Sequence, residues 1–294
     1  MKTVLKTLVG LLAVLVLTFI LGPTVEAPVI SKPLPQIEIP LEELSNWVAE
    51  KEAPFTTLKA DNQSKLVFAD SIPQKTEYAI VYLHGFSGSA EDGAPVHEQI
   101  AETLGANLYL PRLLAHGLEG EENLLEYTGE GSLDSAREAL AVGKILGEKV
   151  ILMGTSTGCT LALTLAAEHP ELAALIMYAP NIRINHPLDF VATLPWGLQI
   201  IRKVEGGLYY YIQNPSAAKK QYWTTKYRLE APVQMQKLLE TAMVPATFNK
   251  ITVPVFSGFY YKNETEQDPT VSVEAMRQMF QELGTASHLK EEKA

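Results

Sequence analysis

The chain has 294 residues, of which 47 % are hydrophobic and 20 % are charged. This length and apolar content suit one large domain, or one domain with an insertion, that buries a sizeable core. The formal net charge is −10 and no basic block could displace counterions from phosphates, so nucleic-acid binding is not an expected function.

The N-terminal residues have the pattern of a targeting segment. Lys2 and Lys6 precede an apolar run from Leu8 to Leu21, which is typical of an export signal or a membrane anchor. The run is short for a membrane span of about 20 residues, and Pro28 disfavours cleavage just before it. We expect residues 1–22 to be an uncleaved signal-anchor, a transmembrane helix that contacts the membrane and keeps the catalytic domain outside the cytoplasm. The alternative is secretion after signal cleavage.

Residues 23–51 connect this segment to the globular part. Five prolines lie between Pro23 and Pro40, and such a composition predicts an extended tether. Helical spacing of apolar residues from Leu41 to Ala53 predicts a short helix that lies against the domain.

Strands and helices then alternate along the chain. Strands are expected at Lys65–Ala69, Tyr78–Leu83, Asn107–Leu110, Val150–Met153, Ala174–Tyr178 and Val253–Tyr260. Helices are expected at Ser132–Ile145, from Thr160 to His169, and at Ser272–Leu283. This order predicts the α/β class, with a mostly parallel, doubly wound sheet formed by residues 52–180 and 248–294.

Residues 181–247 interrupt that order and are predicted to form a cap, or lid, over the ends of the strands. The segment is rich in aromatic residues, namely Trp196, Tyr209, Tyr210, Tyr211, Tyr222, Trp223 and Tyr227. An aromatic cap favours an apolar substrate group, although the same side chains could simply pack over the sheet.

The motif Gly154-Thr155-Ser156-Thr157-Gly158 lies between an expected strand and an expected helix. A serine on such a turn is a nucleophile elbow. Ser156 would take a strained conformation, and the two glycines avoid clashes as the helix folds back on the strand. The free N–H groups of the helix would face the negative charge that develops in acyl transfer. The alternative for Ser156 is an ordinary tight turn.

Three stretches together resemble the α/β-hydrolase superfamily, most closely its carboxylesterases and monoacylglycerol lipases. Leu83–Phe86, Gly154–Gly158 and Asp268–Val271 are similar to the oxyanion loop, the elbow and the acid loop of that family. The resemblance covers about residues 78–284. It implies the α/β-hydrolase fold, with an inserted cap and Ser156 as the nucleophile.

The same resemblance implies the other catalytic groups. The backbone N–H groups of Phe86 and Thr157 would form the oxyanion hole. Asp268 would orient the catalytic histidine and stabilise its cation. Glu264 and Glu266 lie in the same loop and stay open as alternative acids.

The catalytic histidine is the missing part of the pattern. In the family, a last apolar strand follows the final helix, and the histidine comes after that strand. The residues after Gly284 are polar and predict no strand, so we expect the C-terminal strand to be missing and the histidine to lie beyond Ala294. His288 is a minor candidate, because it precedes the place where that strand should begin and would lie on the wrong side of the sheet from Ser156.

The remaining histidines are expected to have other roles. His84 and His116 lie in loops of the family pattern and are expected to be structural. His97, His169 and His186 carry no motif and are expected on the surface. No His-x-x-x-His or His-x-His pair exists, and Cys159 is the one cysteine, so no metal site and no cofactor are predicted.

The sequence thus predicts a serine hydrolase that cleaves small-molecule or lipid esters of carboxylic acids through an acyl-enzyme. Alternatives within the fold are a peptidase or an acyltransferase. An alternative from another class is a catalytically impaired binding module that keeps the elbow.

Overall fold

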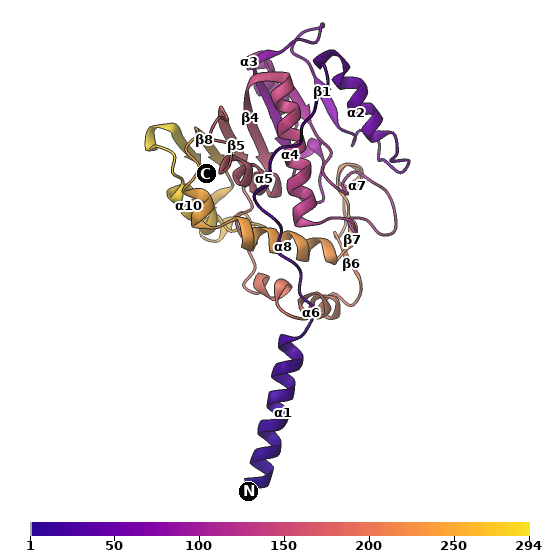
Figure 1. The fold of residues 1–294 in the computed structure, drawn as a ribbon, viewed down its shortest axis with the longest axis vertical. Helices are drawn as coiled ribbons and strands as arrows, with labels where there is room; N and C mark the ends of the chain where they lie inside the picture. Colours follow the sequence, from indigo (N-terminus) through magenta and orange to yellow (C-terminus); the bar gives the residue numbers. More distant parts are fainter. Residues whose placement is uncertain (1) are drawn as a thin grey trace.

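The computed structural model describes residues 2–294, with the backbone alone for residue 3, and contains a seven-stranded sheet (Figure 1). The strands are β1 (Lys65–Val67), β2 (Thr76–Leu83), β3 (Asn107–Leu110), β4 (Gly147–Thr155), β5 (Ala174–Tyr178), β8 (Val255–Gly258) and β11 (Lys290–Lys293). Their spatial order is β1-β3-β2-β4-β5-β8-β11. Strand β1 is antiparallel to β3, and every other pair is parallel. The predicted mostly parallel sheet is confirmed.

The central strands are apolar on both faces because helices cover both. In β2, Val81 and Leu83 belong to one core cluster, whereas Ile80 and Tyr82 belong to the other. Successive side chains of a strand point to opposite faces. A continuous apolar run such as residues 79–83 is therefore typical of a strand buried on both sides.

The first face carries α4 (Gly129–Leu146), α5 (Thr157–Ala166) and α10 (Val273–Glu282), and the second carries α3 (Val96–Leu104). Helix α4 begins one turn earlier than the sequence suggested. Its N-cap is Thr128, whose hydroxyl accepts a hydrogen bond from Gly131 N, and not Ser132. Helix α10 begins where its expected range does, and Ser272 is its N-cap, since Ser272 Oγ accepts from Ala275 N.

The segment between β5 and β8 holds small elements. They are the 3-10 helix η3 (Asp189–Thr193), α6 (Gly197–Val204), β6 (Tyr209–Tyr211), α7 (Ala217–Tyr222), β7 (Lys226–Arg228), α8 (Glu230–Ala242) and α9 (Pro245–Phe248). Strands β6 and β7 form an antiparallel ribbon. Figure 1 shows α6, β6 and β7 together beyond one end of the central sheet. That this segment acts as a lid stays a prediction.

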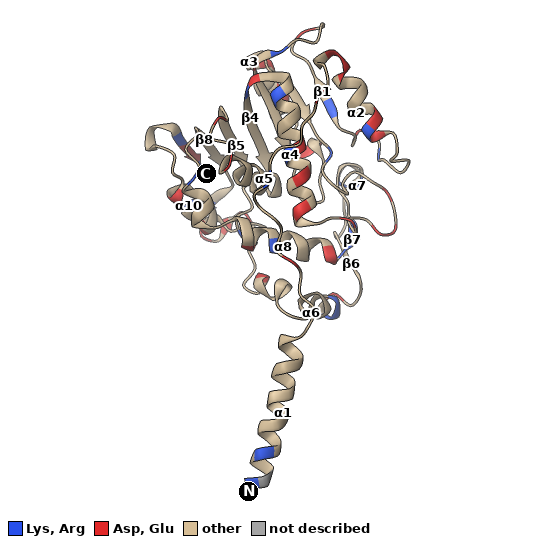
Figure 2. Cartoon of the chain, in the orientation of Figure 1, with Lys and Arg blue, Asp and Glu red and all other residues tan. Residues whose placement is uncertain are grey.

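The N-terminal helix α1 (Lys2–Ile20) projects from the rest of the molecule (Figure 1), and its two basic residues lie near its amino end (Figure 2). No helix within residues 2–294 is both long enough and apolar enough to cross a membrane. Lys2 and Lys6 are part of the helix, so its uninterrupted apolar run is shorter than the roughly 20 residues of a span. The predicted transmembrane signal-anchor and the localisation drawn from it are therefore wrong, and the predicted membrane partner has no spanning helix to support it.

The proline-rich segment before α2 (Leu44–Glu52) is extended, as its composition predicts, and it also packs on the domain. Ile30, Leu34 and Ile37 lie against the larger core cluster. Lys32 pairs with Glu130 and Asp134 at the start of α4. The tether is thus fixed along α4 by both apolar and ionic contacts.

The expectation that the C-terminal strand is missing is wrong. Residues Lys290–Lys293 form β11, which pairs in parallel with β8 from Val255 to Gly258. An edge strand needs backbone hydrogen bonds on one side only and can carry polar side chains on both faces. Hydropathy could not reveal β11, because its four residues are all charged.

Leu152 in β4 tests the core, because its side chain is fully buried at the centre of the sheet. We expect Leu152→Ala to lower the free energy of unfolding by about 2–5 kcal/mol, from lost burial and the cavity left behind. Urea denaturation followed by circular dichroism measures it. Ile72→Ala is the control, since Ile72 is 75 % exposed, and an equal loss in both variants would contradict this account of the core.

Candidate active site

Ser156 lies on a strained turn between β4 and α5. Its backbone has φ 52° and ψ −118°, a region that residues with a Cβ rarely adopt. Ser156 N donates to Tyr178 O at 3.0 Å, and Ser156 O accepts from Cys159 N at 2.9 Å and from Asn181 N at 3.1 Å. These bonds tie the turn to β5 and to the segment that follows β5, so the surrounding chain holds the strain in place.

The turn also requires an unusually close approach of two backbones. A Cβ added to Gly158 would lie 1.8 Å from the carbonyl oxygen of Leu83, at the end of β2. A Cβ added to Gly85 would lie 3.3 Å from Ser156 Cβ. The loop that follows β2 therefore lies directly beside the candidate nucleophile.

This arrangement brings the two predicted oxyanion residues next to Ser156 in different ways. Thr157 is the buried first residue of α5, and the first N–H groups of a helix have no partner within the helix. Phe86 follows Gly85 in the loop after β2. The assignment of both N–H groups to an oxyanion hole stays a prediction.

The histidines His84 and His116 hold this loop as neutral side chains. Leu113 N donates to His84 Nε2 at 3.1 Å, and Ser87 N donates to His116 Nε2 at 3.0 Å. In each ring Nδ1 lies within 2.9 Å of a backbone carbonyl oxygen and must carry the proton. Burial lowers the pKa of His84 to about 4 and that of His116 to about 3. Both have the structural role that was expected.

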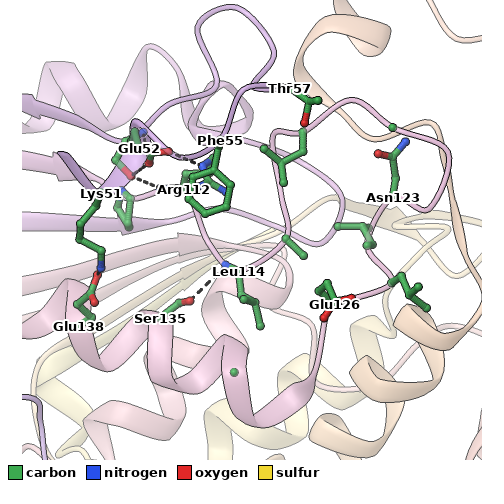
Figure 3. Close-up of a pocket in the computed structure, with 18 of the residues that line it drawn as sticks. Lys51, Glu52, Phe55, Thr57, Arg112, Leu114, Asn123, Glu126, Ser135 and Glu138 are labelled. Atoms are coloured by element: carbon green, nitrogen blue, oxygen red, sulfur yellow. Dashed lines mark hydrogen bonds and ion pairs between the residues drawn. The ribbon is translucent and has the colours of Figure 1, made fainter. Parts of the chain in front are cut away.

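A buried ion pair supports the loop that carries His116. Arg112 Nε lies 2.8 Å from Glu52 Oε2, and its guanidinium lies 4.0 Å from the centre of the Phe55 ring (Figure 3). Arg112 also donates to His116 O at 3.1 Å, and Ser135 Oγ accepts from Leu114 N. Helices α2 and α4 thus fix the chain behind the oxyanion loop.

Figure 3 also shows the cavity of about 810 Å³ that these residues line. It lies between α2, α4 and the loop 111–126, and Ser156 is not among its lining residues. This cavity is therefore separate from the elbow.

Asp268 follows the hairpin of β9 (Tyr261–Asn263) and β10 (Glu266–Gln267). Its Oδ1 accepts hydrogen bonds from Thr270 N at 2.8 Å and Val271 N at 3.0 Å. This loop is joined to the chain after β5, because Asn185 Nδ2 donates to Asp268 O.

The two alternative acids of this loop already have partners. Glu264 accepts from Tyr261 Oη, while Glu266 accepts from Tyr260 Oη and pairs with Lys262. Both are exposed. Asp268 is the better candidate acid on these contacts, and its catalytic role stays a prediction.

The described residues place no histidine in hydrogen bond with Ser156 Oγ. His288 precedes β11, which runs parallel to β8, so His288 lies at the amino edge of the sheet, whereas Ser156 follows the carboxyl end of β4. His97 was expected on the surface but is buried, with Nε2 2.9 Å from Ala90 O. The position of the catalytic histidine stays a prediction.

A group of hydrogen-bonded polar side chains beside the site was not predicted from the sequence. Asp92 lies in the 3-10 helix η2 (Ala90–Gly93) and accepts hydrogen bonds from Gly85 N and Tyr82 Oη. Tyr82 Oη also lies 2.7 Å from Thr155 Oγ1. An acid in a polar turn is usually exposed, so the sequence carried no signal for it. Within residues 2–294 no group of three or more His, Cys, Asp or Glu could hold a metal ion.

Aromatic rings from distant parts of the chain meet beside the loop after β2. The Phe86 ring packs edge-on against Tyr127 at 5.2 Å and against Tyr227 at 5.4 Å, and Tyr210 stacks on Tyr227. Tyr210 and Tyr227 belong to the β6–β7 ribbon. The aromatic segment after β5 therefore contacts the loop that lies beside Ser156.

The neutral histidines make stability depend on pH. The folded pKa of His116 lies below that of an unfolded histidine, so protons bind the unfolded chain preferentially as the pH falls from about 6.5 to about 3. We expect the free energy of unfolding to fall on acidification, with His116 contributing about 1.4 kcal/mol per pH unit. His116→Gln, which keeps an acceptor for Ser87 N, should remove the His116 share of this slope in urea denaturation between pH 6 and 4, while the contributions of His84 and Asp92 remain. The exposed His186→Gln is the control, and equal slopes in both would contradict the assignment.

Comparison with known proteins agrees with this geometry. A family model, described as the alpha/beta hydrolase family, matches residues 80–291. A thermostable monoacylglycerol lipase from Bacillus sp. (strain H-257) is 30 % identical over 97 residues, which are 33 % of this chain and 38 % of that enzyme. The match therefore spans well under two thirds of the relative's length.

Two solved structures share the fold. One, described under the metagenome-derived lipolytic enzymes LipS and LipT, has a TM-score of 0.64 and 14 % identity, with 80 % of this chain and 88 % of that chain covered. A monoacylglycerol lipase from Paleococcus ferrophilus has a TM-score of 0.54 and 17 % identity, with coverages of 79 % and 87 %. Such low identities show the fold alone. The family match, however, covers more than half of the sequence, and the chain therefore belongs to the alpha/beta hydrolase family.

Proposed function

We propose that the chain is a serine hydrolase that cleaves carboxylic esters through an acyl-enzyme, with Ser156 as its nucleophile. The observation that carries the proposal is the strained backbone of Ser156 at the start of α5, beside the loop after β2. A protein does not keep a serine at positive φ unless the surrounding structure enforces it, and such strain is concentrated at functional sites. Membership of a hydrolase family supports the same assignment.

In the proposed reaction Ser156 Oγ attacks the ester carbonyl carbon and a base takes its proton. The carbonyl oxygen becomes an oxyanion that the N–H groups of Phe86 and Thr157 stabilise, and one such donor contributes on the order of 3 kcal/mol to lowering the barrier. The alcohol leaves with a proton, and water then releases the acid from the serine. Asp268 would orient a histidine base and stabilise its cation.

The substrate we propose is an ester with an apolar acyl group, such as a monoacylglycerol. The rings of Phe86, Tyr127 and Tyr227 form an apolar wall beside the proposed oxyanion loop. A curated relative and one structural neighbour are described as monoacylglycerol lipases. The match covers only 38 % of that relative's length. The proposed substrate is therefore supported by the aromatic rings and by this similarity together.

A binding module that does not turn over is the second candidate. It is favoured by one observation, namely that the described residues bring no histidine into hydrogen bond with Ser156 Oγ. The two experiments below separate it from the hydrolase.

Ser156→Ala tests the nucleophile. The fluorescent fluorophosphonate that labels activated serines should react with the wild-type chain and not with the variant, because the variant lacks Oγ. Hydrolysis of p-nitrophenyl esters should fall to the buffer rate in the variant. Ser71→Ala is the matched control, since Ser71 is exposed and lies outside the site. Equal ester hydrolysis by wild type and Ser156→Ala would overturn the proposed nucleophile.

Added imidazole tests the base. A positioned general base contributes about 10²–10⁴-fold to the rate, and free imidazole should restore part of that where no histidine contacts Ser156. We expect ester hydrolysis by the 294-residue chain to rise about tenfold at saturating imidazole, after subtraction of the rate of Ser156→Ala at the same concentration. No imidazole effect, with no labelling by the fluorophosphonate, would favour the binding module.

A further inference from the structure

We propose that Asp92 is a positioning residue that holds the oxyanion loop in register with the nucleophile elbow; this inference rests on the proposed function. Asp92 touches no reacting atom. It acts through Gly85, the residue before Phe86, and through Thr155, the residue before Ser156.

The contacts form a chain of three links. Asp92 Oδ2 accepts from Gly85 N at 2.7 Å, and Asp92 Oδ1 accepts from Tyr82 Oη at 2.5 Å. Tyr82 Oη lies 2.7 Å from Thr155 Oγ1. Gly85 directly precedes the proposed oxyanion donor Phe86, and Thr155 directly precedes Ser156. The side chains of Asp92, Tyr82 and Thr155 thereby join the backbone of the oxyanion loop to the elbow.

The direction of each bond follows from the number of protons. A carboxylate can only accept and a phenol has one proton, so Tyr82 donates to ionised Asp92 and accepts from the Thr155 hydroxyl. If Asp92 is protonated, its Oδ1–H donates a hydrogen bond to Tyr82 Oη, and the Tyr82 hydroxyl then donates to Thr155 Oγ1. The bond from Gly85 N then loses its charge-assisted strength. Protonation of Asp92 therefore weakens the hydrogen bond that holds the loop at Gly85, while all three hydrogen bonds persist.

The groups around Asp92 place this change near neutral pH. Burial is the largest influence and raises its pKa to about 7, while the bonds from Tyr82 and Gly85 and the charge of Lys219 on α7 lower it. Cys159 on α5 also faces the carboxyl, and burial raises the pKa of its thiol, which keeps it neutral. His97 on α3 packs on the Tyr82 ring at 4.7 Å between centroids.

The same loop is held on its far side by the segment after β5. Thr224 N donates to Ser87 O at 2.7 Å, and a Cβ on Gly88 would lie 3.1 Å from both Asp92 Oδ2 and Trp223 Nε1. The loop is therefore enclosed, and the bond from Gly85 to Asp92 is the contact that fixes its amino end beside Ser156.

The test compares Asp92→Asn with Glu91→Gln. Asparagine can accept from Gly85 N and donate to Tyr82, so it imitates the protonated acid at every pH. Glu91 is an exposed neighbour on the same turn, and its change to glutamine removes the same charge outside the chain of bonds. Selective ¹⁵N-glycine labelling, with the Gly85 signal assigned by Gly85→Ala, gives the amide proton shift of Gly85 as a function of pH.

We expect the Gly85 amide proton to titrate with a midpoint near pH 7 in wild type and in Glu91→Gln, and to stay flat in Asp92→Asn. In the ester assay Asp92→Asn should lower kcat about tenfold at pH 8 with KM within about twofold, because the oxyanion forms only in the transition state. Thr155→Val, which breaks the other end of the chain, should lower kcat in the same direction. This second variant keeps the test open if Asp92→Asn does not fold.

A Gly85 shift that does not titrate in wild type, or an unchanged kcat in both Asp92→Asn and Thr155→Val, would overturn the inference. A wild-type chain that hydrolyses no ester, with or without imidazole, would overturn the proposed function instead. In that case the Gly85 titration alone still decides whether Asp92 holds the loop.

Discussion

The contact on which the rest of the site depends is the close crossing of α5 over the end of β2. Gly158 lies so near the carbonyl oxygen of Leu83 that no side chain fits between them. This crossing turns the chain sharply enough to leave Ser156 at positive φ, and it brings the loop after β2 against the serine. Because parallel strands end at the same edge of the sheet, β5 can then bond the turn through Tyr178 O. The strain is local, whereas the contacts that maintain it come from β2, from β5 and from the segment after β5.

Around that crossing the chain uses buried polar side chains to fix backbone rather than to react. His84 and His116 accept backbone N–H groups on one side of the loop, and Asp92 accepts Gly85 N on the other. Buried donors and acceptors without partners are costly, so each such bond restricts the loop to few conformations. An oxyanion hole gains from this rigidity, because its N–H groups need no reorganisation as charge develops.

The sequence was sufficient for the parts of this site that depend on backbone pattern. The central strands are apolar on both faces, and the elbow has glycines where an added Cβ would clash with neighbouring backbone. The family resemblance also led us to expect the loop after β2 beside Ser156, and Gly85 of that loop does lie there. The catalytic roles of Ser156 and Phe86 stay predictions. The structural roles of His84 and His116 also followed from their loops.

The features that the sequence could not reveal depend on tertiary context. Strand β11 is formed by four charged residues, and it exists because β8 offers it a free edge. His97 is buried because it covers the Tyr82 ring, which no local pattern predicts. Asp92 gave no signal for the same reason, since only the folded loop turns its carboxyl toward Gly85 N. The prediction for the N-terminal helix is wrong in the opposite way, because the local apolar pattern predicts a membrane span, whereas the helix is not both long and apolar enough to make one.

The buried groups behind the oxyanion loop oppose each other in their response to pH. The two histidines have lowered pKa values, so they favour the folded state less and less as the pH falls below about 6.5. Asp92 has a raised pKa of about 7, so its contribution is present at low pH and is lost as the pH rises toward that value. Near neutrality both histidines are already neutral, and of these three groups only Asp92 changes charge there. Among these three groups, the loop therefore responds to pH in the neutral range through the Asp92 carboxyl, whose ionisation destabilises the fold while it strengthens the hydrogen bond from Gly85 N.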